Sequence, residues 1–267
     1  MIAPLSLQGR WVLLTGASSG LGEAMARQLV RDHGAHLVLV ARRAEKLQAL
    51  RTELEQLGAQ CQVIAADLSR EADVQRVFDQ ATAHAVIQGV ILNAGITHFG
   101  RHEELSWPDF RQLLDTNVSS LVQLASLFAP YMARQNSGGA LLLVSSIAGF
   151  VPVPYQAAYA GSKAFVSNFG LSLGQELREQ GLSLTVFAPG GIDTAMTQNS
   201  RLRYFENSPF LQDVDSCARD GLQAFIARKA LFVPGRLNRA QLLATRLVPR
   251  PWLAMITQAA YRRALDN

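Results

Sequence analysis

The sequence predicts an α/β fold in which a parallel sheet of about seven strands carries helices on both faces. Short apolar runs without polar alternation recur along the chain, and each is followed by a segment of helical periodicity. Runs of this kind are typical of parallel strands that are buried on both faces. Because no stretch rich in Pro, Gly or Ser separates the units, we expect one doubly wound parallel sheet in a single domain.

Each apolar run has the length of a strand, and each periodic segment has the length of a helix of several turns. The predicted strands are 11–15, 37–41, 61–65, 89–92, 140–145, 182–187 and 231–233. The predicted helices are 21–32, 45–57, 71–82, 107–133, 156–179 and 217–229. Gly34 and Gly58 follow the first two helices, and glycine is common just past a helix C-terminus.

The regular pattern weakens beyond the sixth strand. Residues 193–216 mix polar side chains with large apolar ones, and we interpret them as a mobile lid. Two further helices are expected over about 238–248 and 252–264. We therefore assign residues 1–235 to the main α/β unit and residues 236–267 to a basic helical C-terminal extension of the same domain.

The composition indicates a folded protein without a membrane span. Hydrophobic residues make up 49% of the chain and charged residues 17%, which favours a buried core over disorder. The apolar runs are much shorter than the roughly 20 residues of a membrane-spanning helix, and the N-terminus lacks the pattern of a signal peptide. Cys61, Cys217 and the histidines show no metal-ligand spacing. We expect a cytoplasmic protein without a metal site.

The C-terminal part of the chain is strongly basic. From Arg228 onward it has eight Lys or Arg and one acid, for a net charge of +7, whereas the rest of the chain carries −3. Two interpretations remain open. We favour a solvated basic face on packed helices over contact of residues 236–264 with an anionic membrane surface. A nucleic-acid partner is not expected, because no basic stripe with interleaved aromatic residues accompanies the charge.

A glycine-rich turn follows the first predicted strand and opens the first helix. The sequence of residues 15–22 is TGASSGLG, with glycines at 16, 20 and 22. Glycines let the backbone approach a pyrophosphate closely, and the free N–H groups of a helix N-terminus bind anions. This turn is therefore a candidate phosphate site of a dinucleotide.

The end of the second strand indicates which dinucleotide is preferred. A protein that prefers NAD usually carries Asp or Glu there, to hold the ribose 2′-hydroxyl. This chain has Ala41, followed by Arg42 and Arg43. Because guanidinium groups are always charged and can bind two phosphate oxygens at once, we favour NADP over NAD.

Three residues supply the chemistry expected beside that cofactor. Tyr159 and Lys163 are four residues apart on a predicted helix, which places them on the same face. An ammonium near a phenol favours the phenolate, so we expect Lys163 to lower the pKa of Tyr159 from about 10. Ser146 would hydrogen-bond the substrate oxygen that Tyr159 protonates or deprotonates. Ser145 is expected to be structural or to contact the cofactor.

These segments resemble the short-chain dehydrogenase/reductase family over about residues 8–195. The resemblance implies a Rossmann-type fold, an adenine contact from Asp67, and a nicotinamide carboxamide held by Ile192 and Thr194. It also implies that Asn117 holds a water in a proton relay that reaches Lys163. The chain departs from the family at Leu92, where Asn is common; this affects strand packing more than catalysis. The expected cofactor-binding residues are Gly16, Ser18, Ser19, Gly20, Leu21, Gly22, Arg42, Arg43, Asp67, Leu68, Asn93, Ala94, Gly95, Tyr159, Lys163, Pro189, Gly190, Ile192 and Thr194.

We therefore expect an NADP(H)-dependent oxidoreductase that interconverts a carbonyl and a secondary alcohol. The expected catalytic residues are Asn117, Ser146, Tyr159 and Lys163. Apolar residues within 150–155 suggest a lipophilic substrate, and His98 and Phe99 are further candidates for the pocket wall. The alternative function is an NADP sensor without turnover, which the intact Ser146, Tyr159 and Lys163 argue against.

Family resemblance also bears on assembly. Members commonly form dimers or tetramers through the helices that carry Asn117 and Tyr159, so we expect a homodimer or homotetramer. The sequence does not decide whether the C-terminal helices cap the substrate cleft or extend that interface.

Overall fold

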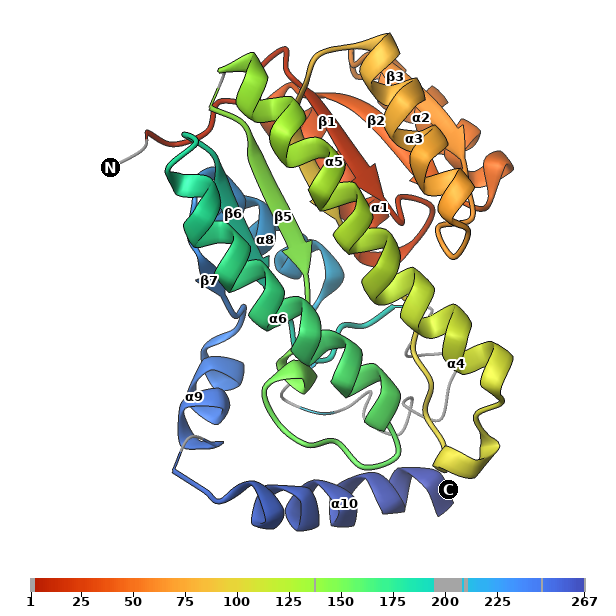
Figure 1. The fold of residues 1–267 in the computed structure, drawn as a ribbon, viewed down its shortest axis with the longest axis vertical. Coiled ribbons are helices and arrows are strands. Elements are labelled where there is room, and N and C mark those ends of the chain that lie inside the picture. Colours follow the sequence, from red (N-terminus) through yellow and green to blue (C-terminus); the bar gives the residue numbers. More distant parts are fainter. Residues whose placement is uncertain (1–2, 137, 195–207, 209–210, 246, 267) are drawn as a thin grey trace.

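One parallel sheet organises the chain. The computed structural model describes residues 3–136, 138–194, 208, 211–245 and 247–266. In these residues seven strands form a sheet of order β3-β2-β1-β4-β5-β6-β7 (Figure 1). Their bounds are β1 Trp11–Thr15, β2 His36–Ala41, β3 Cys61–Ala65, β4 Ile87–Leu92, β5 Ala140–Val144, β6 Ser183–Phe187 and β7 Leu231–Phe232. All neighbouring strands pair in parallel, so the predicted doubly wound α/β fold is confirmed.

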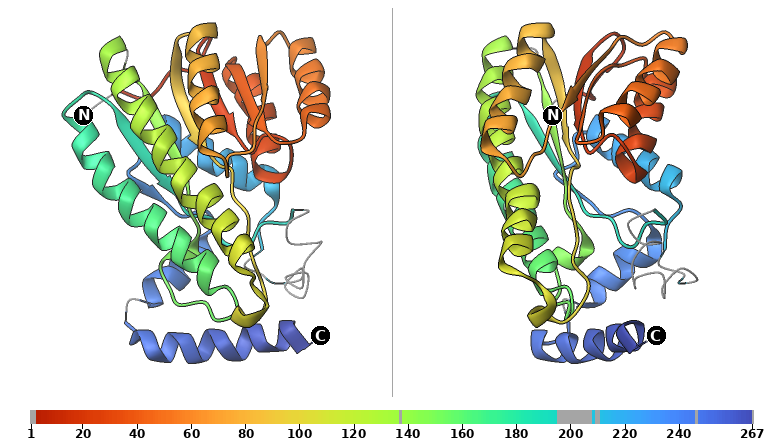
Figure 2. Two further views of the ribbon diagram at one scale, coloured as in Figure 1. Left: turned by 45° about the vertical axis from the view of Figure 1, so that its right-hand side comes forward. Right: turned by 90° about the vertical axis from the view of Figure 1, so that its right-hand side faces the viewer.

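Helices connect the strands and cover both faces of the sheet (Figures 1 and 2). Their bounds are α1 Gly20–His33, α2 Ala44–Gln56, α3 Glu71–His84, α4 Trp107–Leu114, α5 Ser120–Gln135, α6 Ala157–Arg178, α8 Val214–Ile226, α9 Arg236–Thr245 and α10 Arg250–Asp266. Short 3-10 turns occupy residues 102–104 and 147–149.

The alternation of side chains along each strand divides the core into two layers. In β1, Val12 and Leu14 face a layer with α1, α2 and α8. Leu13 points the other way, into a layer with α3, α5 and α6. All three side chains are fully buried. Burial on both faces explains why the strands are continuously apolar in sequence.

The segment predicted as one helix over 107–133 is interrupted. A π-helical turn at Asp115–Ser119 separates α4 from α5. A π-helical turn holds one residue more than an α-helical turn, and the apolar periodicity of the sequence does not show this insertion. The sequence therefore predicts one continuous helix. The turn contains Asn117, which is 1% exposed, and π-turns within helices are frequent at functional sites.

The expected lid over 193–216 lies largely outside the described residues. The following helix, α8, begins at Val214, three residues before the expected start. The Asp213 carboxylate accepts a hydrogen bond from the backbone N–H of Ser216 at 2.8 Å. Asp213 therefore caps the helix N-terminus, because it satisfies one of the N–H groups that the first turn leaves free.

The two C-terminal helices, α9 and α10, lie beyond the carboxyl ends of the strands (Figures 1 and 2). Leu253 and Ala264 of α10 are buried, and the Thr257 hydroxyl donates a hydrogen bond to the Pro152 carbonyl oxygen at 3.0 Å. Pro152 belongs to the loop between Ser146 and Tyr159, so α10 packs over the predicted catalytic segment. In the described residues, no helix combines the length and apolar character that crossing a membrane requires.

Candidate active site

The predicted site residues gather at the carboxyl edge of the sheet. The glycine turn follows β1, Asn93 follows β4, Ser146 follows β5 and Pro189 follows β6. The strand order reverses between β1 and β4, which are neighbours in the sheet but not in the sequence. Ligands of open α/β sheets bind at this switch point, outside the carboxyl ends of the strands.

The glycine turn is held tightly against the end of β4. Gly16 has φ 70°, and a Cβ there would lie 2.7 Å from the Asn93 side-chain nitrogen. The Asn93 side chain donates to the Thr15 carbonyl oxygen at 3.0 Å, and the Thr15 hydroxyl accepts the backbone N–H groups of Asn93 and Ala94 at 3.0 Å each. Only glycine fits this conformation and this close approach.

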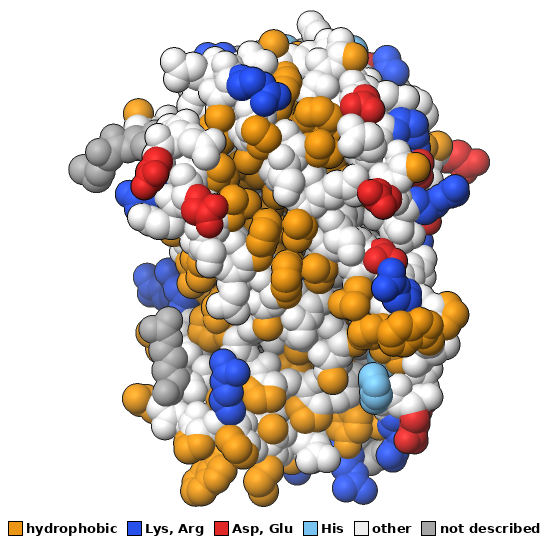
Figure 3. Space-filling model, viewed as in Figure 1, with side chains coloured by type: hydrophobic (Ala, Val, Ile, Leu, Met, Phe, Trp, Pro, Cys, Tyr) orange, Lys and Arg blue, Asp and Glu red, His pale blue; other side chains and the backbone are white. Residues whose placement is uncertain are grey.

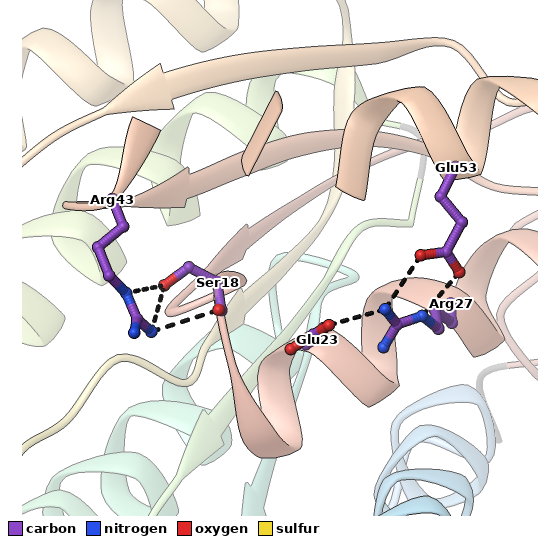
Figure 4. A network of polar contacts seen from close by, with 5 residues as sticks. All are labelled: Ser18, Glu23, Arg27, Arg43 and Glu53. Atoms are coloured by element: carbon purple, nitrogen blue, oxygen red, sulfur yellow. Dashed lines mark hydrogen bonds and ion pairs between the residues drawn. The ribbon is translucent and has the colours of Figure 1, made fainter. Parts of the chain in front are cut away.

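Arg43 is the arginine that reaches the glycine turn. Its guanidinium donates to the Ser18 hydroxyl at 3.0 Å (Figure 4) and to the Ser19 hydroxyl at 2.8 Å. Arg42 is exposed. Arg43 thus connects the start of α2 to the glycine turn through the hydroxyls of two serines.

An ionic network holds the two helices that flank this arginine. Arg27 of α1 pairs with Glu53 of α2 at 2.7 Å and with Glu23 at 2.7 Å (Figure 4). The hydrogen bond to Glu53 is the largest cause that holds the pKa of Arg27 above its usual range. Arg43 directly precedes α2, so the ion pair between α1 and α2 helps to fix the position of Arg43 beside the glycine turn.

The predicted catalytic residues are brought together from three elements. Ser146 lies two residues beyond the end of β5, Tyr159 and Lys163 lie one turn apart on α6, and Asn117 lies in the π-turn. The Lys163 ammonium donates to the Val144 carbonyl oxygen at 2.9 Å and lies 5.8 Å from the centre of the Tyr159 ring.

The side chain of Asn117 is fixed by the main chain of Ile96. It donates to the Ile96 carbonyl oxygen at 2.9 Å and accepts the Ile96 N–H at 2.8 Å. It also donates to the Ser162 hydroxyl at 3.1 Å, which in turn donates to the Tyr159 carbonyl oxygen at 2.7 Å. Ser162 is therefore a connecting residue that our sequence analysis missed, although it directly precedes Lys163.

The pKa values of the two α6 residues differ from the expectation. Burial raises the pKa of Tyr159 above its ordinary value; a hydrogen bond between the Tyr159 and Ser146 side chains acts in the opposite direction, and Tyr261 adds to the increase. Burial lowers the pKa of Lys163 to about 8. The expected lowering of the Tyr159 pKa by Lys163 is thus wrong for this structure, because loss of hydration dominates at both groups.

Ser145 was expected either to be structural or to contact the cofactor, and its hydrogen bonds are structural ones. Its hydroxyl donates to the Lys163 carbonyl oxygen at 2.8 Å and lies 2.7 Å from the Ser167 hydroxyl. These bonds tie β5 to α6. Ser146 instead accepts the Ala148 N–H at 3.2 Å and donates to the Pro189 carbonyl oxygen at 3.4 Å.

The remaining cofactor candidates border the same edge. Asp67 accepts the N–H of Ser69 at 3.1 Å and its hydroxyl at 2.9 Å, and Leu68 is buried. A Cβ on Gly20 would lie 3.2 Å from the Thr194 methyl group, so Thr194 stands against the glycine turn.

An aromatic pair and a cavity lie near the segment that follows β4. Phe99 and Tyr261 stand with ring centres 5.8 Å apart. A cavity of about 210 Å³ is lined by Ile96, Thr97, His98, Leu105, Asp109, Gln112 and Leu113. His98 lines this cavity, whereas Phe99 contacts Tyr261; that either residue lines the substrate pocket stays a prediction. Tyr261 was missed, because nothing in the sequence links α10 to Tyr159.

No group of histidine, cysteine or acidic residues suited to a metal ion occurs among the described residues. Both cysteines are buried thiols, and burial raises the pKa of Cys61 to about 11.

Comparisons with known proteins agree with this geometry. The family profile of the short chain dehydrogenases matches residues 10–204. An uncharacterized oxidoreductase from Myxococcus xanthus is 34% identical over 205 residues, which cover 76% of this chain and 79% of that protein. The 17-beta-hydroxysteroid dehydrogenase type 3 of Mus musculus is 30% identical over 225 residues, which cover 82% of this chain and 70% of that protein.

A solved structure shows the same architecture. A short-chain dehydrogenase from Sphingobium yanoikuyae in complex with NADPH superposes with a TM-score of 0.79 at 28% identity, covering 90% of this chain and 97% of that one. Other similar solved chains contain NADP, NADH or NAD. With a family match that spans most of its length, this chain belongs to the short-chain dehydrogenase/reductase family.

Proposed function

We propose that the protein is an NADP(H)-dependent oxidoreductase that interconverts a carbonyl and a secondary alcohol on a lipophilic substrate. Family membership supports the coarser statement, an oxidoreductase that acts on alcohols or carbonyls with a nicotinamide cofactor. The observation that carries the finer proposal is the position of Ser146, Tyr159 and Lys163 at the same sheet edge as the glycine turn.

The residues present fit a dinucleotide. The turn at Gly16 has a positive φ, and the first turn of α1 presents N–H groups toward the sheet edge, where a pyrophosphate would bind. Arg43, held by Ser18 and Ser19, would contact the 2′-phosphate of NADP, and the exposed Arg42 adds positive charge. When bound, the nicotinamide supplies or accepts the hydride.

Tyr159 would act as the general acid or base. In the reducing direction its phenol gives a proton to the substrate oxygen, so that the carbonyl becomes an alcohol and Tyr159 becomes a phenolate. The hydroxyl of Ser146 donates a hydrogen bond to the same oxygen and stabilises the charge that develops there. In the oxidising direction the phenolate takes the proton from the alcohol. Burial raises the pKa of Tyr159 above its ordinary value, so the phenol, the form that gives the proton, is favoured over the phenolate.

Lys163 and Asn117 would return the proton to Tyr159. A Cβ placed on Gly95 would lie 3.3 Å from the Lys163 nitrogen and 3.4 Å from the Asn117 side-chain oxygen. Glycine therefore leaves open a space that both polar atoms border. A water there would connect Lys163 to Asn117, as the proposed relay requires.

The substrate side favours an apolar, ring-containing ketone. Tyr261 is close enough to the reacting phenol to raise the pKa of Tyr159, and the ring of Phe99 stands beside that of Tyr261. Rings offer large apolar contact area to a flat substrate. The hydroxysteroid dehydrogenase of Mus musculus, a relative by sequence, is named for a substrate of that kind.

We also propose a homodimer or homotetramer that uses the outer face of α6. Phe165 is 46% exposed and stacks on Phe169 with ring centres 5.8 Å apart. These rings line a shallow hollow together with Ala164, Asn168 and Ser172. Figure 3 shows apolar side chains gathered along this side of the molecule. Exposed apolar surface of this kind marks interaction sites.

Fluorescence titration with NADPH and NADH, followed by NADPH oxidation across a panel of ketones, tests the proposal. We expect tight binding of NADPH and turnover of a cyclic or aromatic ketone. Tyr159→Phe should lower turnover by about 10²-fold or more while it leaves NADPH binding intact, because only the acid is lost. Unchanged turnover in this variant would overturn the role of Tyr159. Binding of neither nucleotide would overturn the proposal as a whole.

A further inference from the structure

Asn238 of α9 carries a buried amide on a helix whose other side chains are largely exposed. Its side chain is 2% exposed, whereas its sequence neighbours Leu237 and Arg239 are exposed. The Asn238 side-chain nitrogen donates to the Gln212 side-chain oxygen at 3.3 Å. The Asn238 side-chain oxygen has no hydrogen-bond partner within the described residues. Because burial of an unsatisfied oxygen costs free energy, apolar packing alone does not explain an asparagine at this position.

The Asn238 amide lies against the segment that leaves β6, residues 189–194, which we call the exit segment. A Cβ placed on Gly190 would lie 2.6 Å from the Asn238 side-chain nitrogen and 2.9 Å from its side-chain oxygen. Only a residue without a Cβ leaves room for the amide there. A Cβ on Gly235, which directly precedes α9 and has φ 78°, would lie 3.2 Å from the same nitrogen. The amide therefore fills a space between two glycines that are far apart in the sequence.

Gln212 connects Asn238 to the next residues of the exit segment. The backbone N–H of Gln212 donates to the Gly191 carbonyl oxygen at 2.9 Å, and its carbonyl oxygen accepts the N–H of Asp193 at 3.0 Å. Ile192 and Gln212 form a parallel bridge through these bonds. The side chain of Gln212 accepts the hydrogen bond from Asn238. Asn238 and Gln212 thus hold the exit segment together, one by its side chain and the other mainly by its backbone.

The exit segment runs between the two ends of the candidate active site. At its start, the Pro189 carbonyl oxygen accepts the Ser146 hydroxyl at 3.4 Å and the Ile147 N–H at 2.9 Å. At its end, a Cβ placed on Gly20 would lie 3.2 Å from the Thr194 methyl group. Ser146 is the proposed hydrogen-bond donor to the substrate, and Gly20 belongs to the proposed pyrophosphate turn. A dinucleotide that reaches from the turn to Ser146 would therefore have its nicotinamide end along the exit segment.

We propose that Asn238 is a positioning residue for the nicotinamide end of the cofactor. It contacts Gly190 and binds Gln212, and so fixes the exit segment in the conformation that the cofactor meets. This inference rests on the proposed function, because it assumes a dinucleotide at the edge of the sheet. It deepens that function by giving the C-terminal extension a part in cofactor binding, through α9, which lies beyond the carboxyl ends of β6 and β7 (Figure 1).

Hydrogen exchange of the nucleotide-free protein tests the positioning. The variant Asn238→Leu keeps a side chain of similar size and removes the hydrogen bond to Gln212. The control Gln241→Leu replaces an exposed amide on the same helix. We expect the backbone N–H groups of Gln212 and Asp193 to exchange roughly five- to tenfold faster in Asn238→Leu than in the wild type, and at the wild-type rate in the control. Unchanged exchange in β5 shows that the variants are folded.

Gln212→Leu removes the same hydrogen bond from its other end. It should speed exchange of the Asp193 N–H by a similar factor. The double variant Asn238→Leu/Gln212→Leu should exchange no faster than Asn238→Leu alone, because both substitutions remove one shared interaction. Independent increases that multiply in the double variant would overturn the proposal, as would equal exchange rates in Asn238→Leu and Gln241→Leu.

Two nucleotides separate an effect on the nicotinamide end from a general loss of structure. NADPH carries the nicotinamide, whereas adenosine 2′,5′-bisphosphate has the adenine, the ribose and the 2′-phosphate without it. We expect the Kd of NADPH to rise by about fivefold in Asn238→Leu, and the Kd of the bisphosphate to change by less than about twofold. An equal rise for both nucleotides would show that Asn238 supports the whole site and would overturn the positioning role.

Failure of this inference is distinguishable from failure of the proposed function. Wild-type protein that bound neither nucleotide would overturn the proposed function and the cofactor role of Asn238 together. Wild-type affinity for NADPH in the variant Asn238→Leu would overturn the role of Asn238 alone, because the cofactor would then bind without the contact between α9 and the exit segment.

Discussion

The ammonium nitrogen of Lys163 lies 5.8 Å from the centre of the Tyr159 ring and donates its hydrogen bond to a main-chain carbonyl oxygen at 2.9 Å. The two side chains share a helix face, as their spacing predicts, but each is governed by its own burial. The pKa of Tyr159 is raised and that of Lys163 is lowered to about 8. Both shifts favour the neutral form of each group, because burial removes hydration from the phenolate and from the ammonium. With a pKa of about 8, Lys163 still holds its proton at neutral pH.

The buried lysine predicts a pH dependence of stability. The unfolded chain holds the Lys163 proton up to its ordinary pKa of 10.5, whereas the folded protein releases it near 8. Between these values the unfolded state binds more protons, so the free energy of unfolding rises with pH. We expect the rise due to Lys163 to be about 2 to 3 kcal/mol between pH 8 and 10.

Denaturant unfolding of the wild type and of Lys163→Met, at several pH values in this range, measures that contribution. The difference between the two free energies of unfolding should change with pH, because the other titrating groups are common to both proteins. A difference that stays constant from pH 8 to 10 would show that the folded protein does not lower the pKa of Lys163.

Arg43 should determine the preference for NADPH. Replacing it in Arg43→Ala removes the guanidinium held at Ser18 and Ser19, and we expect the Kd of NADPH to rise by about tenfold or more. The Kd of NADH should change by no more than about twofold, because NADH has no 2′-phosphate. Fluorescence titration of both nucleotides measures the two values.

Arg42→Ala is the matched comparison, and we expect a smaller effect on NADPH. Both arginines are exposed, but the hydrogen bonds to Ser18 and Ser19 come from Arg43, so Arg42 contributes charge next to the turn. If Arg43→Ala weakened both nucleotides equally, the arginine would support the glycine turn and not the 2′-phosphate.

Gly95→Ala should block the proposed proton relay. A methyl group there would fill the space beside the Lys163 nitrogen and the Asn117 oxygen. We expect the rate of turnover at saturating substrate to fall by roughly tenfold, since proton return to Tyr159 is slowed, while the Kd of NADPH is unchanged. The control is Gly161→Ala on α6, where a Cβ would meet nothing within 4 Å. Equal turnover in the two variants would argue against a relay through this space.

The sheet was predictable because its strands are buried on both faces. β1 and β3 have the bounds that the sequence predicts, at 11–15 and 61–65, and most other bounds differ by one to three residues. The glycine turn was also predictable, because the sequence places a glycine at position 16. The backbone there has a positive φ that other residues rarely adopt. Both predictions depend on local patterns that a single sequence contains.

The features that the sequence did not reveal depend on contacts between distant segments. The π-turn around Asn117 is stabilised by the main chain of Ile96, which no periodicity records. The direction of the Tyr159 pKa depends on burial by the folded chain. Which of the two adjacent arginines reaches the glycine turn depends on where the turn places Ser18 and Ser19, and the hydrogen bonds come from Arg43.

Tyr261 should affect the reaction from the C-terminal helix. Tyr261→Phe keeps the ring beside Phe99 and removes the hydroxyl that raises the pKa of Tyr159. The rate of alcohol oxidation rises with pH as Tyr159 becomes the phenolate base. We therefore expect this rise to occur at lower pH in the variant. KM for a cyclic ketone should be nearly unchanged, because the apolar contact area remains.

Tyr261→Ala separates this electrostatic effect from the contact of the ring. Loss of the ring should raise KM for a cyclic ketone several-fold, since a large side chain no longer borders the substrate. A small aliphatic ketone should be affected less, because it does not extend to the wall formed by Phe99 and Tyr261. If neither substitution changed the pH profile or KM, α10 would pack over the loop at Pro152 without contributing to the substrate site.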